Sequence, residues 1–304
     1  MKVEIGVVWL SILFASGAAQ SQTYVKSRQA WPGPAVQTID AAGKNAVVLS
    51  DRVDGATIGP VAVTNAFRAV ETRNEAAVIS NLRIVGLTGT DIQRECIRLR
   101  GQVTNVLLDN VDCRMRSAPQ TSPNLPIGLH VESGSGITIQ NSSFSGFQMT
   151  GAQGTYWNGD GIAVEGGVTD FRIVNVRADD NMDAGFDLKS SGWLDNVSAS
   201  NNARNYRIWN GMRIGTITVG DSLKRGGTAS PSGFWIRGSA AVPVVEIDRL
   251  VVRMTRPGVI FRIDDGPIDL RIGTCDIQAP AGTVFIASES KSTRTRLGTG
   301  CPAG

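Results

Sequence analysis

Charged residues, aromatic residues and histidine are all scarce in this chain. Of its 304 residues, 19% are charged, 6% are aromatic and one is His. We find no Ser-His-Asp arrangement that this single His would serve, and no phosphate-binding loop or dinucleotide fingerprint occurs. The apolar content of 41% is ordinary, so a folded chain is expected. Gly is abundant, with 35 residues, which suits many short strands and tight turns.

Long apolar runs are absent as well. The apolar run near the N-terminus covers residues 5–15, behind Met1-Lys2 and ahead of small residues at 16–19. This order is typical of a secretory signal peptide, with cleavage expected near Ala19. The run is too short to span a membrane, and no later segment reaches that length. We therefore expect a secreted protein, periplasmic or extracellular, without a membrane span.

Four Cys residues remain after the expected cleavage site: Cys96, Cys113, Cys275 and Cys301. An even number in an exported chain permits disulfides, and four Cys residues allow three pairings. The favoured pairing is Cys275 with Cys301, which would close the C-terminal end, and Cys96 with Cys113. No Cys-x-x-Cys pair occurs, so a thiolate zinc site is not expected.

The basic residues are mostly Arg. The formal net charge is +3, and only six of the 30 basic residues are Lys. Arg binds carboxylates through a planar fork, so an acidic ligand is compatible with this composition. Such a small positive excess in an exported chain does not support a nucleic-acid partner. We expect a monomer.

A short motif recurs along the chain: an apolar residue, an outward residue, a second apolar residue and a polar one. Its period-2 alternation predicts strands with one buried face. Successive copies lie 20 to 33 residues apart. The copies begin at Ile97, Leu129, Ile162, Phe186, Tyr206, Phe234, Val259 and Val284.

A second series comes about ten residues after these strands, and its copies end in Asn or Gly. Both residues tolerate the left-handed backbone conformation. One such turn in every rung would stack the Asn side chains in a hydrogen-bonded ladder. The residues that end the copies are Gly86, Asn110, Asn141, Asn175, Asn196, Gly215 and Gly273.

The two series together predict an all-β, single-domain right-handed parallel β-helix. Each rung buries little surface alone, and stacking makes a continuous core; the handedness agrees with the bias of parallel crossovers. We expect an N-terminal cap with the first rungs at 20–77, and the remaining rungs with the C-terminal end at 78–304. An antiparallel sandwich is the main alternative, but its two-residue hairpin signals are scarce.

Three inserts interrupt the later rungs and are expected to leave the helix as loops that wall a groove on one face. They cover residues 117–126, 144–158 and 221–232.

Alignment of the repeats predicts two outward columns of side chains, since stacked parallel strands lie ~4.8 Å apart. Acidic residues gather in the middle rungs of these columns, with Arg residues on either side. The first column is Arg98, His130, Ala163, Asp187, Arg207 and Trp235. The second is Arg100, Glu132, Glu165, Lys189, Trp209 and Arg237.

The densest polar stretch begins at Trp157 and includes two adjacent strands. Asp160 and Asp183 stand at the starts of these strands, and Asp187 points outward from the second. Three carboxylates that converge from two rungs suit Ca²⁺, which takes six to eight oxygen ligands in flexible geometry. Asp179 or Asp180, on the preceding turn, is a candidate fourth ligand.

This stretch resembles the calcium motif of family nine pectate lyases, which belong to the pectin lyase-like superfamily. Those right-handed parallel β-helix enzymes cleave polygalacturonate by β-elimination with calcium. The resemblance covers roughly residues 155–210 and rests on Asp160-Gly161-Ile162 and, one rung later, residues 183–188. It implies calcium-ligand roles for Asp160, Asp183 and Asp187. The family has a second Asp where this chain has Ala184, and its catalytic Lys compares with Arg207 in this chain.

The pattern favours a polysaccharide lyase that acts on an acidic, uronate-containing polysaccharide. Such an enzyme removes the proton alpha to a carboxylate, and a bound calcium would stabilise the developing charge. Lys189 and Arg207 are the candidate bases. Tyr156 and Trp157 are candidates for stacking on sugar rings. The other candidate substrate contacts are Arg98, His130, Glu132, Glu165 and Trp209.

Two other functions remain open. A uronate C5-epimerase begins with the same proton abstraction and differs in the later steps. A non-catalytic β-helix that binds glycan or serves as a surface module needs no base, and the Ala at position 184 favours it. Unsaturated product distinguishes the lyase from both.

The charged side chains of the middle rungs also have a purely structural explanation. Neighbouring positions of opposite charge form ordinary cross-strand ion pairs. Two such pairs are available, Asp187 with Arg207 and Glu165 with Lys189. The inward aromatic residues are expected in the core: Phe186, Tyr206 and Phe234.

Overall fold

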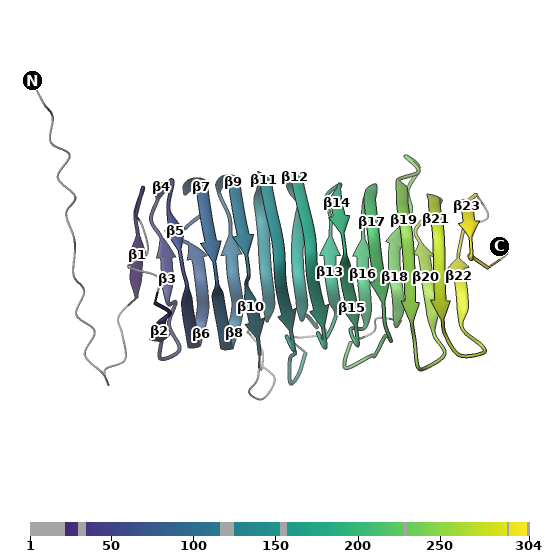
Figure 1. Cartoon of the computed structure of the whole chain (residues 1–304), viewed down its shortest axis with the longest axis horizontal. Coiled ribbons are helices and arrows are strands. Elements are labelled where there is room, and N and C mark those ends of the chain that lie inside the picture. The colour runs from purple at the N-terminus through teal and green to yellow at the C-terminus, as the bar shows by residue number, and fades with distance from the viewer. Residues whose placement is uncertain are drawn as a thin grey trace, which may run out of the picture.

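The computed structural model describes residues 22–29, 35–115, 125–152, 157–227, 230–290 and 292–302. Throughout these ranges the regular elements are β-strands, and their pairings are parallel. The chain coils into an elongated right-handed parallel β-helix (Figure 1). This confirms the predicted fold and rules out the antiparallel sandwich. The described ranges contain no helix long and apolar enough to cross a membrane. The predicted signal peptide lies outside them.

The strands of the first rungs are short, apart from β6 to β9. They are β1 (Thr23–Val25), β2 (Gln37–Asp40), β3 (Val47–Leu49), β4 (Arg52–Asp54), β5 (Thr57–Ile58), β6 (Val61–Thr72), β7 (Val78–Val85), β8 (Leu87–Leu99), β9 (Gln102–Asp109) and β10 (Asp112–Arg114).

The later rungs include the two longest strands, β11 and β12. The strands are β11 (Ile127–Ser145), β12 (Asp160–Asp179), β13 (Ala184–Leu188), β14 (Gly192–Asp195), β15 (Val197–Ser200), β16 (Arg204–Ile208), β17 (Met212–Val219), β18 (Ser232–Arg237), β19 (Val244–Arg253), β20 (Val259–Asp264), β21 (Asp269–Gln278), β22 (Val284–Ser288) and β23 (Arg294–Thr299).

One ladder of paired strands, the site ladder, passes through β8, β11, β12, β13, β16 and β18 and continues into β20 and β22. Its first inward column agrees with the predicted motif from Ile97 as far as Phe234. Beyond that point the register differs from the motif by two residues, since Phe234 pairs with Phe261 and not with Val259. The same shift pairs Phe261 with Ile286.

Aromatic rings fill the core beneath the later part of this ladder. Phe186, Tyr206, Phe234 and Phe261 stack with centroid distances of 5.1, 5.0 and 4.5 Å, and each is fully buried. The Tyr206 hydroxyl donates to the Thr218 carbonyl at 2.8 Å, so its one polar atom is satisfied. The expectation that these rings are core residues is confirmed.

The predicted Asn ladder is present along one turn of the helix. Asn196 donates through Nδ2 to Oδ1 of Asn175 at 2.8 Å, and Asn175 donates to Asn141 in the same way at 3.0 Å. These residues have φ near +50°, which Asn tolerates better than most other residues. Asn141 donates onward to the Asp109 carboxylate at 2.9 Å, so an Asp side chain ends this run.

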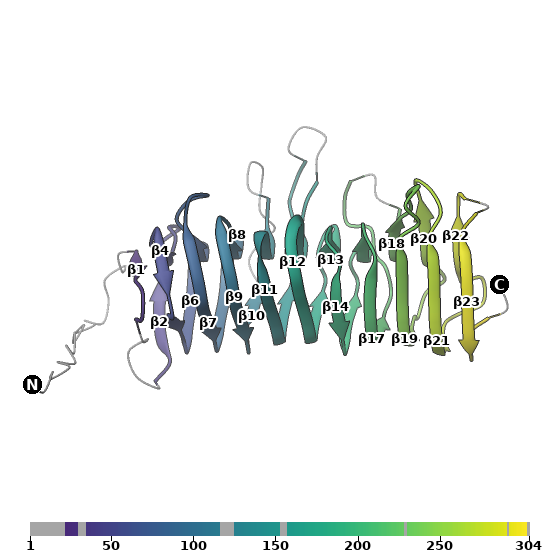
Figure 2. The same ribbon diagram turned by 90° about the horizontal axis from the view of Figure 1, so that it is seen from above.

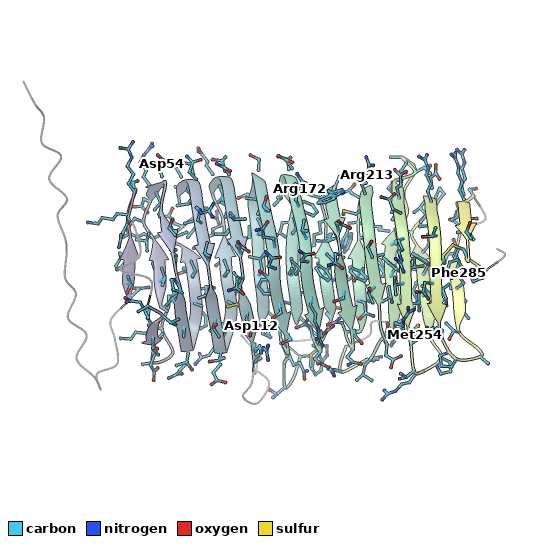
Figure 3. The ribbon with its side chains drawn as sticks, in the orientation of Figure 1. Asp54, Asp112, Arg172, Arg213, Met254 and Phe285 are labelled. Atoms are coloured by element: carbon cyan, nitrogen blue, oxygen red, sulfur yellow. A yellow bond between two sulfur atoms is a disulfide. The ribbon has the colours of Figure 1, made fainter. Side chains whose placement is uncertain are left out.

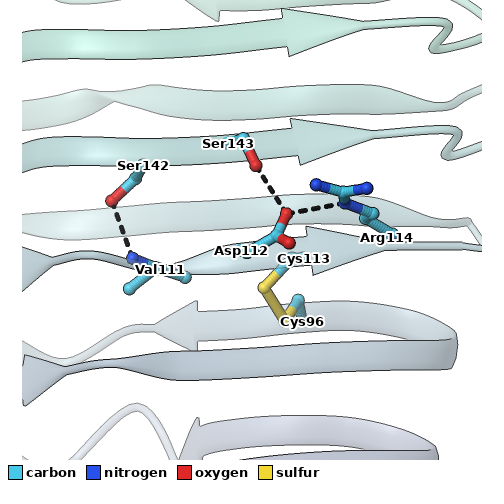
Figure 4. Close-up of a disulfide and its surroundings, with 7 residues drawn as sticks. All are labelled: Cys96, Val111, Asp112, Cys113, Arg114, Ser142 and Ser143. Carbon is cyan, nitrogen blue, oxygen red and sulfur yellow. Dashed lines mark hydrogen bonds and ion pairs between the residues drawn. A yellow bond between two sulfur atoms is a disulfide. The ribbon is translucent and has the colours of Figure 1, made fainter.

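Both predicted disulfides are formed, Cys96–Cys113 and Cys275–Cys301. Figure 4 shows the first, which joins β8 to β10 inside the helix. Gly89 makes room for it, because a Cβ at that position would lie 2.5 Å from Sγ of Cys96. The second disulfide joins β21 to the chain end after β23.

The described parts of two connections, β11 to β12 and β17 to β18, leave the helix on the same side (Figure 2). They touch each other: a Cβ on Gly226 would lie 2.7 Å from the Trp157 ring. Arg225, on the β17 to β18 connection, also pairs at 2.7 Å with Asp180, which directly follows β12. Most of the first predicted insert, residues 117–126, lies outside the described residues.

Candidate functional site

The predicted first outward column is confirmed by the strand register of the site ladder. Each member stands directly beside the next on the neighbouring rung, and the column continues beyond Trp235 to Arg262. In chain order the column is Arg98, His130, Ala163, Asp187, Arg207 and Trp235. The side chains of this face therefore lie within reach of one another across the rungs.

Arg207 occupies the centre of the predicted acidic cluster. Its Nη1 lies 2.9 Å from Oδ2 of Asp183 and 3.4 Å from Oδ2 of Asp187. The second Asp187 oxygen accepts from Nε1 of Trp209 at 2.7 Å. Asp160 lies on the preceding rung and accepts from the Ala184 amide at 2.9 Å. Asp183 and Asp187 thus share one guanidinium, and Asp160 stands on the neighbouring rung.

These carboxylates do not fit calcium in the arrangement observed. Arg207 contacts two of them, and no group of three or more His, Cys, Asp or Glu side chains in the described ranges is placed to hold a metal ion. Asp179 does not join the cluster, because it pairs with Arg177 and accepts from the Ser200 amide at 2.7 Å. Calcium binding stays a prediction, and it requires Arg207 to leave these oxygens.

Burial changes the acidity of two of these carboxyls. Asp160 and Asp187 are each 3% exposed. Burial, together with the charges of Asp183 and Asp187, raises the pKa of Asp160 well above its usual range. The pKa of Asp187 is also raised by burial, against the opposing effects of Arg207 and Lys189. The cluster therefore has a tendency to hold a proton.

Lys189 and Glu165 form the second predicted pair. Both Glu165 oxygens lie 2.8 Å from Nζ of Lys189, which is also 3.8 Å from Asp187. Burial disfavours the ammonium form, but Glu165 and Asp187 outweigh it, and the pKa of Lys189 is raised. Its side chain is 33% exposed, so Lys189 lies at the solvent-facing edge of this group of charged side chains.

His130 lies among three carboxylates. Its Nδ1 is 3.8 Å from Glu95 and 3.5 Å from Glu132, and its Nε2 is 3.5 Å from Glu165. These distances are at the long end for hydrogen bonds. Burial disfavours the imidazolium, but Glu165, Glu95 and Glu132 outweigh it and raise the pKa of His130 to about 9. Arg98 adds a contact of 2.6 Å to Glu132.

Glu95 is a site residue that the motif did not include. It is 1% exposed and lies 2.6 Å from Nε of Arg68. Glu95 and Asp160 occupy the same register column, since each pairs with Ile127 from opposite sides. Extending the motif by two residues toward the N-terminus would have found it, because Glu95 precedes Ile97 as Asp160 precedes Ile162.

His130 makes the folding free energy depend on pH. Its folded pKa of about 9 lies above the usual 6.5, so its stabilising effect is full below pH 6.5 and is lost as the pH rises through 9. The loss is at most about 3 kcal/mol. Urea unfolding of the wild type should therefore show a larger decrease between these pH values than unfolding of His130→Gln. Equal decreases in the two proteins would contradict this role of His130.

Two Trp rings stand beside the Asp–Arg cluster. Trp209 and Trp235 pack edge to face at 5.0 Å, and Nε1 of Trp235 donates to Asp264 at 2.6 Å. The guanidinium of Arg207 lies 5.2 Å from the centre of the Trp209 ring. Trp235 is 8% exposed and is a packing residue, whereas Trp209 keeps part of its surface open.

A hollow of about 650 Å³ opens next to Trp209. Arg237 stacks over the Trp209 ring at 5.1 Å and pairs with Asp265 at 3.2 Å, where both side chains are at least half exposed. This hollow, the first pocket, lies at the ends of β13, β16, β18 and β20. Its lining residues are Lys189, Trp209, Asn210, Arg237, Gly238, Ser239 and Asp265.

Two predicted sugar-stacking residues lie on the second insert. Tyr156 is outside the described residues. Trp157 is half-buried and packs against Gly226 and Gly227 of the β17 to β18 connection. Trp157 therefore joins two loops in this structure, and of the predicted aromatic contacts only Trp209 lines the first pocket in the described part of the chain.

No protein-family model and no curated protein matches the chain. Among solved structures, it is similar to an endo-xylogalacturonan hydrolase from Aspergillus tubingensis, with 14% identity, a TM-score of 0.44 and coverage of 90% of this chain and 91% of that one. It is also similar to pectate lyase Pel9A, with 15% identity, a TM-score of 0.42 and coverage of 86% of this chain and 72% of that one. The periplasmic alginate epimerase AlgG shares 12% identity, with a TM-score of 0.41 and coverage of 88% of this chain and 79% of that one. At such identities and TM-scores the likeness concerns the fold alone.

Proposed function

We propose that this protein is a secreted β-helix protein that binds and acts on an acidic, uronate-containing polysaccharide. The observation that carries the proposal is the first pocket, where Lys189 and Arg237 flank the partly open Trp209 ring. The two disulfides suit an oxidising compartment, and we place the protein in the periplasm or outside the cell.

The lining of the first pocket matches the chemistry of a uronate ring. The apolar face of a sugar packs on an indole ring, and the carboxylate needs a cationic partner. Arg237 is suited to that role, because its present partner Asp265 is a half-exposed side chain in a weak surface pair. Asn210 and Ser239 supply hydrogen-bonding groups for the hydroxyls.

The reaction that we propose is β-elimination. A base takes the proton from C5, alpha to the uronate carboxylate. The electron pair of that C–H bond forms the C4–C5 double bond, the glycosidic C4–O bond breaks, and the leaving oxygen takes a proton from solvent. Arg237 would stabilise the negative charge that develops on the carboxylate.

Lys189 is the better placed of the two candidate bases. It lines the first pocket and is one-third exposed, whereas Arg207 is 14% exposed and contacts two carboxylates. Arg also loses its proton only above ~12. Because the pKa of Lys189 is raised, only alkaline solution makes it a free amine in quantity. The proposed enzyme should therefore work best at alkaline pH.

The test is the ultraviolet absorbance of unsaturated uronate, recorded over time after the mature protein is mixed with polygalacturonate or alginate. A rise that increases from about pH 7 to about pH 11 is expected. The rise should be lost in Lys189→Ala and kept in the matched control Lys224→Ala, a loop residue that does not line the first pocket. Parallel samples with calcium and with chelator test the calcium prediction. Equal rates in Lys189→Ala and the wild type would exclude Lys189 as the base.

A glycan-binding module without catalysis is the second candidate. The observation that favours it is that both candidate bases are ion-paired, Lys189 with Glu165 and Arg207 with Asp183. It predicts glycan binding with no unsaturated product at any pH. An epimerase also gives no unsaturated product, but it changes the uronate composition of the recovered polymer, which proton NMR measures.

A further inference from the structure

A second hollow of about 350 Å³ opens on the neighbouring face of the same rungs, outside the site ladder. It lies on the ladder formed by β12, β14 and β17, where the chain has turned the corner after Lys189. This hollow, the second pocket, is lined by Asp170, Phe171, Arg172, Gly192, Trp193 and Arg213.

An indole ring stands between two Arg residues in the strand register of this pocket. Arg172 pairs in register with Trp193, and Trp193 pairs in register with Arg213 on the next rung. The Arg172 guanidinium lies 4.5 Å from the centre of the Trp193 ring. The two Arg residues are two strand spacings apart, roughly 10 Å. Figure 3 labels both along the same long edge of the helix.

In the part of the chain that the structure describes, the two Arg side chains have no carboxylate in an ion pair, unlike Arg98 and Arg207 of the site ladder. Within the described ranges neither Arg172 nor Arg213 forms an ion pair, and both are exposed. The nearby acidic groups are Asp170, which also lines the pocket, and Glu246, which stands next to Arg213 one rung further on. Two open cations beside an aromatic ring favour an anionic ligand with an apolar face.

Two of the residues that line this pocket pack tightly against each other. Phe171 is buried and forms part of the lining. A Cβ on Gly192 would lie 2.3 Å from the Phe171 ring, so only Gly fits above it. Trp193 is the next residue in the chain and pairs in register with Arg172.

We infer that the second pocket is a further subsite for an anionic sugar ring, in which Trp193 packs on the ring and Arg172 or Arg213 binds its carboxylate. The choice of a uronate polymer as the ligand rests on the function proposed above. Lys189 of the first pocket and Gly192 of the second are three residues apart, at most ~11 Å along the chain. One polymer chain that bends around the edge between the two faces can therefore contact both pockets.

The test is calorimetric titration of the mature protein with polygalacturonate. Arg172→Ala combined with Arg213→Ala should weaken binding about tenfold or more, and so should Trp193→Ala. The Arg residues are exposed, so the double variant tests the subsite even if the Trp193 variant fails to fold. The matched control combines Arg52→Ala with Arg83→Ala, which removes the same charge from exposed positions of the first rungs and should leave the affinity unchanged.

Trp209→Ala separates this inference from the proposed function. If Trp209→Ala weakens binding and the double Arg variant does not, the second subsite is wrong and the first pocket stands. If only the Trp193 and double Arg variants weaken binding, the second subsite stands and the first pocket is wrong. If the Arg52/Arg83 control loses as much affinity as the Arg172/Arg213 variant, both losses come from the lower net charge of the protein. That result would overturn the subsite. A wild type that binds no uronan overturns both.

Discussion

Replacement of Phe234 with Ala is expected to lower the free energy of unfolding by about 3–5 kcal/mol. The ring is fully buried and stacks between Tyr206 at 5.0 Å and Phe261 at 4.5 Å. Both neighbours belong to adjacent rungs whose strands are fixed by hydrogen bonds, so the core cannot easily collapse into the space. Urea unfolding monitored by circular dichroism measures the change.

Phe285→Ala is the matched control for this stack. Phe285 meets Phe261 edge to face at 5.5 Å near the C-terminal end, where the core is only partly covered. The same change of side chain there should cost clearly less than at Phe234. Equal losses at the two positions would contradict the view that continuous aromatic stacking holds the later rungs together.

Replacement of Asp187 with Ala is expected to destabilise the protein by about 1–3 kcal/mol, because it leaves the Nε1 donor of Trp209 without its acceptor and removes one of the two carboxylates that Arg207 contacts. Asp187 contacts Arg207 at 3.4 Å and accepts from Trp209 at 2.7 Å. The loss should be seen in urea unfolding. Loss of the Trp209 hydrogen bond should also weaken uronate binding, because it frees the ring that lines the first pocket.

Asp51→Ala is the control for the loss of an acidic side chain. Asp51 pairs with Arg73 at 3.2 Å, but both side chains are 57% exposed, and solvent already screens their charges. Its removal should change stability far less than removal of Asp187. If the two variants unfold at the same urea concentration, the Asp187 cluster is an ordinary surface pair and not the centre of a built site.

The fold could be predicted because its signals are local and repeat in every rung. Alternation gives the buried face of each strand, and Asn141, Asn175 and Asn196 mark one turn per rung. The two-residue error at β20 has a physical cause. Val259 and Phe261 are both apolar and are two residues apart, so they point to the same face of the strand. Alternation therefore cannot show which of them pairs with Phe234. The structure places Phe261 there, where its ring stacks on Phe234.

The first outward column of the site could be predicted from the sequence, but its side-chain contacts could not. Register is determined by the repeat, so the neighbours of Asp187 could be predicted from sequence. Whether Arg207 faces solvent or lies on the Asp carboxylates depends on side-chain conformation, which the pattern does not encode. The Arg172–Trp193–Arg213 arrangement was missed for a different reason. It lies on another face, where the repeat in the sequence indicates turns and not outward columns.

The most direct test of uronate binding at the first pocket is a crystal structure of the protein with a short oligogalacturonate at saturating concentration. We expect a uronate ring on the Trp209 face, with its carboxylate bound by Arg237 or Lys189. Sugar bound only at places remote from Trp209, or no sugar at any concentration reached, would contradict this proposal.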